Sequence, residues 1–443
     1  MYLRFWGTRG SIATPGPSTN LFGGNTSCVE VVTAGGRRVI FDCGTGARPL
    51  GAHLMATAAK PIEAVILLSH THWDHIQGFP FFVPLFVQGN RFIVIGPKGA
   101  NATLPEVLAG QMEYTYFPVE LGQMGANIEY RDITEGTADL GDVRISGQLS
   151  NHPAITMGYR IEADGASLLY LCDYEPYWEP LWHSEAEPGK LGSILHEGDR
   201  RHAAFMQNAD VVIHDAQYTP EEYPAKKNWG HSTWTYVTQI AAAAGVKRLF
   251  LTHHDPSHND EFLLEIEGRS QELARSIGSN LRVSCAREGF EETCENAGAA
   301  RTAVNEIRNG HAKHSESLLI LVVDDDEDLR LLARKALIRG GHEVLEAESG
   351  EEGLQIVESH RPHLLLLDLN MPGMDGFEVL RHLRSTEFGR TLPVIVLTAM
   401  GDEESARVSF ESGATDFLAK PFTPPQLDAR VRSCFAHAAA NRN

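Results

Sequence analysis

Short apolar runs separated by Gly, Pro and Asn turns make up the chain as far as about Glu292. Runs rich in Val, Ile, Leu and Phe that end at turn residues are typical of β-strands, and helical spacing of apolar residues fills the longer intervals. The expected strands are Met1–Trp6, Cys28–Val32, Arg38–Phe41, Ala64–Leu68, Phe92–Ile95, Val143–Gln148, Ser167–Leu171, Val211–His214 and Arg248–Leu251. This alternation predicts a layered α/β or α+β domain with mixed sheets.

A second alternation follows a polar segment. Residues 293–316 are small and polar without a clear apolar face, which predicts a linker. Beyond it, the expected strands are Leu318–Val323, Glu343–Leu345, His363–Leu367, Val394–Leu397 and Asp416–Ala419, with a last helix at Pro424–Ala438. Strands that alternate with helices in this way predict a doubly wound parallel sheet. We therefore expect one domain over residues 1–292, a linker over 293–316 and a second domain over 317–443.

Composition constrains the location and the partners. A chain of 443 residues is long enough for two or three domains. It has no apolar stretch of the roughly 20 residues that a membrane helix needs, and its start lacks a leader pattern, so we expect a cytoplasmic protein without membrane contact. The six cysteines are scattered and predict neither disulfides nor a cysteine zinc site. A formal charge of −20 argues against a broad grip on nucleic acid.

The strongest chemical signal is the segment His70–His75, which follows the apolar run Ala64–Leu68. It contains three histidines and one aspartate, and these are the ligands of hydrolytic Zn²⁺, Mn²⁺ or Fe sites. In an extended or turning segment His70 and His72 face one side, whereas Asp74 and His75 turn towards another point. The spacing therefore favours two metals side by side over one.

Four further segments place the same residue types at the end of an expected strand. They contain His152, Asp173, His214-Asp215 and His253-His254. A strand that ends in His or Asp holds a ligand on a rigid element at the edge of a sheet. Each segment alone is also explained by a buried, hydrogen-bonded polar residue. Together with His70–His75 they predict a convergent metal site.

This set of motifs resembles the metallo-β-lactamase fold, and within it the phosphodiesterase branch that includes ribonuclease Z and small-nucleotide phosphodiesterases. The resemblance covers about residues 1–290. The matching pieces are Gly7–Ser11, Phe41–Gly46, His70–His75, His152, Asp173, His214–Ala216, Gly230–Thr233 and Leu251–His253. It implies an αββα sandwich with the site at one edge of the two sheets.

The resemblance also implies a ligand set of two metals. His70, His72 and His152 would hold one metal, and Asp74, His75 and His253 would hold the other. Asp173 would bridge them, and His254 is a weaker competitor of His253. Zinc is favoured, with manganese or iron as alternatives. Two such cations about 3.5–4 Å apart lower the pKa of a shared water and neutralise charge that builds on phosphorus.

Three further residues are expected to take part in catalysis with Asp74. By the resemblance, His231 contacts the scissile phosphate and protonates the leaving oxygen. The alternative for His231 is a structural residue at the start of a helix capped by Ser232 or Thr233. His214 and Asp215 would orient His231 or a metal ligand.

The size of the substrate depends on the segment Tyr174–Arg201. Ribonuclease Z enzymes resemble one another in a basic, Gly/Pro-rich arm that grips tRNA, whereas this segment is acidic and aromatic for most of its length. It would repel tRNA and could close over a small nucleotide, or it buries its own aromatic residues. Phe79–Phe86 similarly lines a pocket or belongs to the core. We favour a small phosphodiester such as a cyclic nucleotide, with a tRNA-processing or other nuclease as the alternative.

In the second domain, polar side chains follow the strands. Asp324 and Asp325 follow the first expected strand, Asp368 ends the third, Thr398 the fourth and Lys420 the fifth. The carboxyl ends of parallel strands meet in one crevice of a doubly wound sheet. Carboxylates, a hydroxyl and a lysine in this crevice predict a phosphate site assisted by Mg²⁺.

Residues 317–437 resemble the receiver domain of two-component response regulators, a flavodoxin-like (βα)5 fold. By this resemblance Asp368 is the phosphoacceptor, and Asp324, Asp325 and the carbonyl of Asn370 complete the Mg²⁺ site. Thr398 and Lys420 would bind the phosphoryl oxygens, and Phe417 would be the switch aromatic. The implied partner is a sensor histidine kinase or a phosphotransfer protein.

We therefore predict a two-domain signalling enzyme. Its dinuclear phosphodiesterase acts on a small nucleotide, and phosphorylation of Asp368 sets its activity, location or assembly, including assembly into a homodimer. The alternative from another class is a non-catalytic phosphorelay or binding protein with a vestigial metal site. The complete ligand set argues against this alternative.

Overall fold

The chain folds into two compact units, Met1–Glu306 and Ile307–Asn443. The computed structural model describes residues 1–97, 102–178, 181–182, 190–294, 317–399 and 412–420, together with positions 408, 422, 424, 427, 430, 431 and 434. Residues 295–316 of the predicted linker and most of the predicted last helix lie outside these residues. Among the helices that can be described, none combines the length and apolar character that a bilayer crossing needs.

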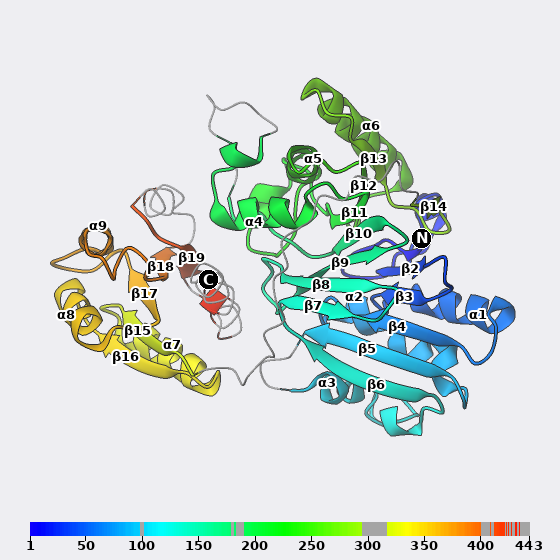
Figure 1. Cartoon of the computed structure of the whole chain (residues 1–443), viewed down its shortest axis with the longest axis horizontal. Coiled ribbons are helices and arrows are strands. Elements are labelled where there is room, and N and C mark those ends of the chain that lie inside the picture. Colours follow the sequence, from blue (N-terminus) through cyan, green and yellow to red (C-terminus); the bar gives the residue numbers. More distant parts are fainter. Residues whose placement is uncertain are drawn as a thin grey trace. The chain divides into compact units, whose positions relative to one another are not determined.

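The first unit contains two seven-stranded sheets, with the orders β14-β1-β2-β3-β4-β5-β6 and β13-β12-β11-β10-β9-β8-β7. The strands of the first sheet are β14 (Glu291–Thr293), β1 (Tyr2–Gly7), β2 (Cys28–Val32), β3 (Arg38–Phe41), β4 (Glu63–Leu67), β5 (Arg91–Pro97) and β6 (Asn127–Ile133). Those of the second are β13 (Arg282–Cys285), β12 (Arg248–Thr252), β11 (Val211–Asp215), β10 (Ala166–Leu171), β9 (Met157–Ala163), β8 (Arg144–Leu149) and β7 (Gly136–Asp139). Figure 1 shows the two sheets in face-to-face packing.

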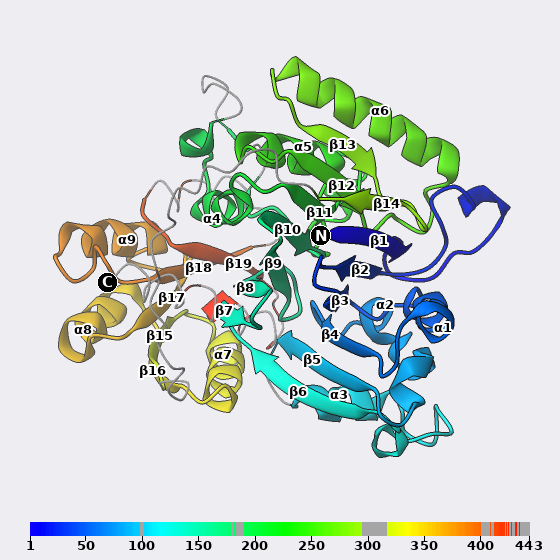
Figure 2. The same cartoon turned by 45° about the vertical axis from the view of Figure 1, so that its right-hand side comes forward.

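Three apolar layers hold the two sheets and their helices together. Successive residues of a strand face opposite sides of its sheet. In β3, Val39 and Phe41 lie in the layer between the sheets, whereas Ile40 packs outward with helix α1 (Ala47–Thr57). Outside the second sheet lie α4 (Glu197–Met206), α5 (Trp234–Ala243) and α6 (Asp260–Ser276), and Figure 2 shows α6 along β13. The predicted αββα sandwich is thereby confirmed.

The direction of the strands gathers the candidate residues at one edge of each sheet. β3, β4 and β5 pair in parallel in the first sheet, as do β10, β11 and β12 in the second. The rings of Phe41 and Tyr170 stack across the sheets, with centroids 4.9 Å apart. The hydroxyl of Tyr170 donates to Asp42 Oδ2 at 2.7 Å. The carboxyl ends of β3 and β10 therefore meet across the sandwich.

The structure adds strands to those expected from the sequence. β6, β7, β9, β13 and β14 complete the two sheets. β14 pairs with β1, and the backbone N–H of Cys294 donates to the carbonyl of Met1 at 2.8 Å. The first unit thus extends at least two residues beyond the predicted end at residue 292, because an edge strand of three residues gives too short a pattern to recognise.

The second unit is a parallel sheet with the order β16-β15-β17-β18-β19. Its strands are β15 (Leu319–Val323), β16 (Glu343–Ala347), β17 (Leu364–Asp368), β18 (Val394–Ala399) and β19 (Asp416–Lys420). Apolar clusters cover both faces. Helix α7 (Glu327–Arg339) packs on one face, whereas α8 (Gly350–His360) and α9 (Gly376–Ser385) pack on the other. This is the predicted doubly wound, flavodoxin-like fold.

Candidate functional site

Three strands of the first unit end in a residue with left-handed backbone. Asp42 follows β3 with φ of 55°, and Asp173 and His253 lie beyond β10 and β12 with φ of 58° and 61°. A residue other than glycine in this region costs roughly 1–3 kcal/mol and persists only where its surroundings hold it. All three side chains are buried, and each has a polar partner in the site: Asp42 pairs with His75, Asp173 with His70, and His253 with Asp74.

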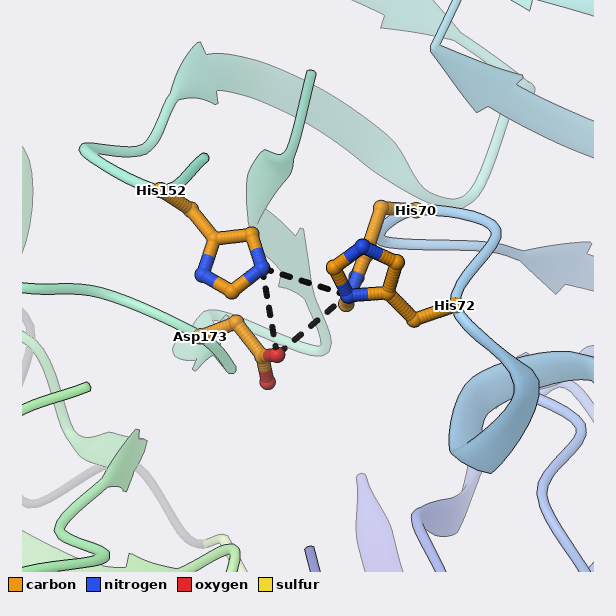
Figure 3. A group of neighbouring side chains, drawn as sticks. All are labelled: His70, His72, His152 and Asp173. Atoms are coloured by element: carbon orange, nitrogen blue, oxygen red, sulfur yellow. Dashed lines mark hydrogen bonds and ion pairs between the residues drawn. The ribbon is translucent and has the colours of Figure 1, made fainter. Parts of the chain in front are cut away.

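The first cluster consists of His70, His72, His152 and Asp173, each offering one ligand atom within 4.8 Å of the others. Nε2 of His70 lies 3.4 Å from Asp173 Oδ2, and Nε2 of His152 lies 3.3 Å from Nδ1 of His72. Figure 3 shows the side chains converging from three separate segments. His72 is exposed, so this cluster opens to solvent on its side.

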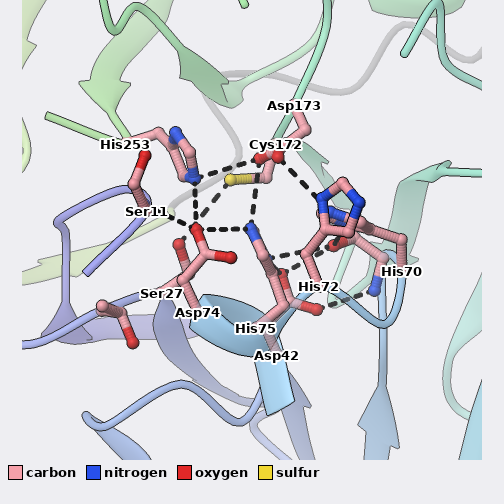
Figure 4. A network of polar contacts seen from close by, with 12 residues as sticks. Ser11, Ser27, Asp42, His70, His72, Asp74, His75, Cys172, Asp173 and His253 are labelled. Atoms are coloured by element: carbon pink, nitrogen blue, oxygen red, sulfur yellow. Dashed lines mark hydrogen bonds and ion pairs between the residues drawn. The ribbon is translucent and has the colours of Figure 1, made fainter. Parts of the chain in front are cut away.

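The second cluster shares Asp173 with the first. Oδ1 of Asp173 lies 3.3 Å from Nε2 of His75 and 3.2 Å from Nε2 of His253. Oδ2 of Asp74 lies 3.3 Å and 3.1 Å from the same two nitrogens (Figure 4). The sulfur of Cys172 lies within 4.8 Å of ligand atoms of His75, Asp173 and His253. Burial raises the pKa of its thiol well above the usual value, which makes the neutral sulfur a poor ligand.

Unpartnered buried atoms indicate that the two clusters fit metal ions. Within the described residues, Nε2 of His70, Nε2 of His75 and Oδ1 of Asp173 are buried without a hydrogen-bond partner. Such atoms are rare in proteins, because each costs about 1–3 kcal/mol when left unsatisfied. Imidazole nitrogens and carboxylate oxygens are common ligands of zinc, manganese and iron. The donor set therefore fits two divalent cations that share Asp173.

Burial keeps most of the imidazoles neutral, as metal ligation requires. It lowers the pKa of His70 and His72, and that of His152 to about 3. His75 behaves differently: burial lowers its pKa, but the charges of Asp74 and Asp173 raise it well above the usual value. A cation at this position would replace the proton that those carboxylates otherwise favour.

The remaining ring nitrogens of the histidines are held by neighbours. Nδ1 of His75 lies 2.8 Å from Asp42 Oδ2, and Nδ1 of His70 lies 3.1 Å from Ser69 Oγ. Nδ1 of His253 lies 3.1 Å from Gln217 Oε1. Such contacts fix the ring and direct Nε2 towards the metal position.

Asp42, Ser69 and Gln217 are not among the site residues predicted from the sequence. For Asp42 a signal was present, because it ends an apolar strand as Asp173 does. Ser69 and Gln217 carry no such signal. They are recognisable only once the neighbouring segments are placed in space.

His231 and Asp215 lie beside the two clusters. Nδ1 of His231 is 3.2 Å from Asp215 Oδ2, and its ring stacks on that of His253 with centroids 4.8 Å apart. Burial lowers the pKa of His231, but the charge of Asp215 and this hydrogen bond raise it to about 9. Thr233 caps α5 by accepting from the backbone N–H of Tyr236. His231 therefore occupies a helix start and also faces the clusters.

The structure does not bring His214 to this site. Its Nε2 lies 2.7 Å from Nε2 of His202 in α4, and its Nδ1 lies 2.7 Å from the carbonyl of Asp215. In β11, Val212 belongs to the core beneath the helices, and His214 lies on the same face of the strand. The expectation that His214 orients His231 or a ligand is corrected accordingly, because the side chain points to the helix layer.

The described part of the segment Tyr174–Arg201 packs on its own domain. Trp182 is buried in the helix-side core, and the ring of Tyr177 stacks on His196 at 4.8 Å. The carboxylate of Asp199 is fully buried. In Phe79–Phe86, Phe79, Phe82 and Leu85 are buried in the core beside α1. These aromatic residues mainly stabilise the fold.

In the second unit, Asp324, Asp325 and Asp368 place carboxylate oxygens within 4.8 Å of one another. Nζ of Lys420 lies 2.7 Å from Asp324 Oδ2 and 3.0 Å from Asp368 Oδ1. Burial raises the pKa of Asp324, and although burial lowers that of Lys420, its hydrogen bonds with both aspartates raise it. The cluster combines a cation position with a fixed ammonium group.

Three further predicted residues of this unit occupy neighbouring strand ends. Thr398 is buried near the end of β18, Asn370 is exposed just after β17, and Phe417 is half-buried in β19. Thr398 and Asn370 thus lie at or beyond the carboxyl ends of their strands. Phe417, in contrast, is the second residue of β19. The parallel registers of β17, β18 and β19 bring Asp368, Thr398 and Lys420 to the same edge of the sheet.

Two family descriptions match the chain: a beta-lactamase superfamily domain at residues 37–254 and a response regulator receiver domain at residues 320–432. The protein therefore joins a metallo-β-lactamase-fold domain to a receiver domain, as the motifs predicted.

Each of the individual relatives matches only part of the chain. Transcriptional regulatory protein AfsQ1 of Streptomyces coelicolor is 44% identical over 114 residues, which are 26% of this chain and 49% of that protein. The chain spans about half the length of the curated relatives it matches. The metallo-beta-lactamase fold protein YhfI of Bacillus subtilis is 17% identical, with a TM-score of 0.46, over 66% of this chain and 99% of that one. The short form of human tRNase Z is 18% identical, with a TM-score of 0.44, over 67% of this chain and 100% of that one.

Proposed function

We propose that the first unit is a dinuclear metal-dependent hydrolase that cleaves phosphodiester bonds in small nucleotides. The observation that carries this proposal is the position of Asp173 between two clusters. One of its carboxylate oxygens faces His70 and the other faces His75 and His253. Two cations that share one carboxylate suit the activation of water and the neutralisation of a phosphodiester.

The ligand assignment follows the two clusters. His70, His72 and His152 would hold one cation, Asp74, His75 and His253 would hold the other, and Asp173 is placed to reach both. Ser11 supports this arrangement, because its backbone N–H donates to Asp74 Oδ2 at 2.7 Å and fixes the carboxylate.

His231 supplies the proton for the leaving oxygen. Asp215 lies 3.2 Å from Nδ1 of His231, and its charge raises the pKa of the ring, which favours the protonated form. The proton on Nε2 is then the one available for transfer. Asp215 itself is fixed by the backbone N–H groups of Tyr174, Gln217 and Ser232.

The second unit regulates the first through phosphorylation of Asp368 by a kinase or phosphotransfer protein. In the unphosphorylated state Lys420 bridges Asp324 and Asp368. A phosphoryl group on Asp368 adds charge and oxygen acceptors, so Lys420 and Thr398 gain new partners. The activity or the assembly of the protein changes with this rearrangement.

Hydrolysis assays on the purified chain test the catalytic proposal. The protein should contain about two equivalents of divalent metal and hydrolyse cyclic nucleotides faster than RNA. His72→Ala and Asp74→Ala should each lower kcat by at least about 100-fold with the fold retained, because each removes a ligand. His53→Ala is the matched control, since His53 lies in α1 with its ring against that of Trp6 and belongs to neither cluster. Full activity in either ligand variant would contradict the proposal.

A further inference from the structure

The loop before His231 carries an exposed tryptophan beside a lysine. Trp229 is 58% exposed, and Nζ of Lys226 lies 4.5 Å from the centroid of its indole ring. Single exposed aromatic residues are common on protein surfaces and need no explanation. Here the ring is paired with a cation and stands two residues before His231, so its surroundings decide what it does.

A buried carboxylate holds this loop in one conformation. Glu175 is 7% exposed and accepts hydrogen bonds from the hydroxyl of Tyr223 at 2.9 Å and from the backbone N–H groups of Asn228 and Gly230 at 2.6 and 2.9 Å. The backbone N–H of Trp229 donates to the carbonyl of Lys226 at 3.1 Å. The exposed ring is therefore placed on a rigid loop, which lowers the entropy cost of binding a ligand.

The same loop contacts the metal-binding and catalytic histidines. The carbonyl of Gly230 lies 2.9 Å from Nδ1 of His152. The ring of Tyr218 lies 5.7 Å from that of His231, and Nζ of Lys226 lies 5.5 Å from the Tyr218 ring. The Tyr218 ring therefore lies next to both Lys226 and His231, the proposed proton donor.

The charge of Lys226 is not used in an ion pair. Across the described residues, no carboxylate lies within 4.0 Å of its Nζ. The two acidic neighbours in sequence have other partners: Glu222 pairs with His258 at 2.9 Å and Glu221 with Arg269 at 3.6 Å. In a chain with a formal charge of −20, a lysine without a carboxylate partner beside the site favours an anionic ligand.

We propose that Lys226 and Trp229 form the nucleotide-recognition subsite of the hydrolase, a conclusion that rests on the function proposed above. Trp229 stacks on the base, and Lys226 binds a phosphate oxygen of the same nucleotide. Indole stacking accepts any base, because every base has a π-face. The subsite therefore selects nucleotides over other phosphodiesters without selecting one base strongly.

Two substrates with the same leaving group test the subsite. Thymidine 5′-(p-nitrophenyl phosphate) carries a base, and methyl p-nitrophenyl phosphate does not. Trp229→Ala should lower kcat/KM for the thymidine ester by about 5- to 100-fold, mainly through KM, which is the range for loss of one base stack. Its effect on the methyl ester should stay within about twofold. Trp229→Phe should retain most of the preference, which separates stacking from misfolding.

Lys226→Gln should lower kcat/KM for both esters by about tenfold, because it removes a contact with the phosphate that they share. Arg269→Gln is the control, since Arg269 also lies over an indole, that of Trp234 at 4.9 Å, but on α6. If the metal-loaded wild-type protein hydrolyses neither ester, the proposed function itself fails. If it hydrolyses both with equal kcat/KM, and Trp229→Ala changes neither, the hydrolase stands and the subsite is refuted.

Discussion

A β-carbon at Gly230 would lie 2.1 Å from Nδ1 of His152, and the residue has φ of 90°. No other residue type fits there without displacing the imidazole that the Gly230 carbonyl fixes. The close approach explains why a glycine directly precedes His231. It also offers a way to separate the position of a metal ligand from its identity.

Gly230→Ala should reduce metal content and lower kcat by about 100-fold, because His152 must move away from its partners. Gly278→Ala is the matched control: it has a comparable φ of 69°, but a β-carbon there meets no heavy atom within 4 Å. The control should lose only about 1–2 kcal/mol of stability through its left-handed backbone and keep its metal. Metal analysis and thermal unfolding of both variants distinguish the two effects. Equal metal content would show that His152 is not held by this carbonyl.

Single site residues could be predicted from the sequence where they follow the end of an apolar strand. His70, Asp173 and His253 lie just beyond the ends of β4, β10 and β12, and the structure brings them together. The sequence says less about the face to which a side chain points. His214 and Asp215 are adjacent, yet one contacts His202 beneath α4 and the other accepts from His231. The apolar alternation of β11 contained this information, because Val212 and His214 share a face.

At the scale of elements, a buried carboxyl group connects helix α4 to its neighbours in the first unit. Asp199 is fully buried and accepts hydrogen bonds from the hydroxyls of Tyr174 and Tyr236, at 3.1 and 2.6 Å, and from the backbone N–H groups of Tyr177 and Trp178. Burial raises its pKa to about 7, against the lowering effect of these donors.

This environment predicts a pH dependence of stability. A raised pKa in the folded state means that the folded protein binds the proton more tightly. The stabilisation is therefore fully present below the unfolded pKa of about 3.9 and is lost as the pH rises to about 7, at no more than about 1.4 kcal/mol per pH unit. Asp199→Asn should remove this slope. The free energy of unfolding of both proteins, measured with denaturant between about pH 4 and 8, checks this prediction. If it depends on pH in the same way in both proteins, Asp199 does not contribute the expected slope.

In the second unit, the acceptor of phosphate should be the last residue of β17. Asp368→Ala should abolish labelling by acetyl phosphate, because its carboxylate lies between the cation position and Lys420. Asp328→Ala is the control, since Asp328 belongs to the same acidic run but is exposed in the first turn of α7. Mass spectrometry of the labelled proteins measures the result. Persistent labelling of Asp368→Ala would refute the assignment.

Elements with buried, continuous apolar runs could be predicted closely, and exposed edge strands could not. β2 and β3 have the expected bounds, and both are largely buried. The residues of β6 are exposed or only half-buried throughout, so its sequence lacks the apolar run by which a strand is recognised. Pairing with β5 rather than composition makes it a strand.

At the scale of the whole molecule, the two units have separate apolar cores. Calorimetry should therefore show two unfolding transitions. A chelator of divalent transition metals should lower the midpoint temperature of one transition. Without the proposed cations, Nε2 of His70, Nε2 of His75 and Oδ1 of Asp173 would be buried without a partner. The other transition, identified by its response to Mg²⁺, should stay unchanged. A chelator that shifted both by the same amount would contradict independent units.

The pairing of β1 with β14 has a consequence for how such proteins are assembled. The carbonyl of Met1 accepts from Cys294, so the two ends of the sandwich leave it side by side. A domain joined at either end would start from nearly the same spot on the first unit. Gene fusions in either order are then geometrically almost equivalent, and a swap that moves the receiver ahead of the first unit should preserve the reach of its tether.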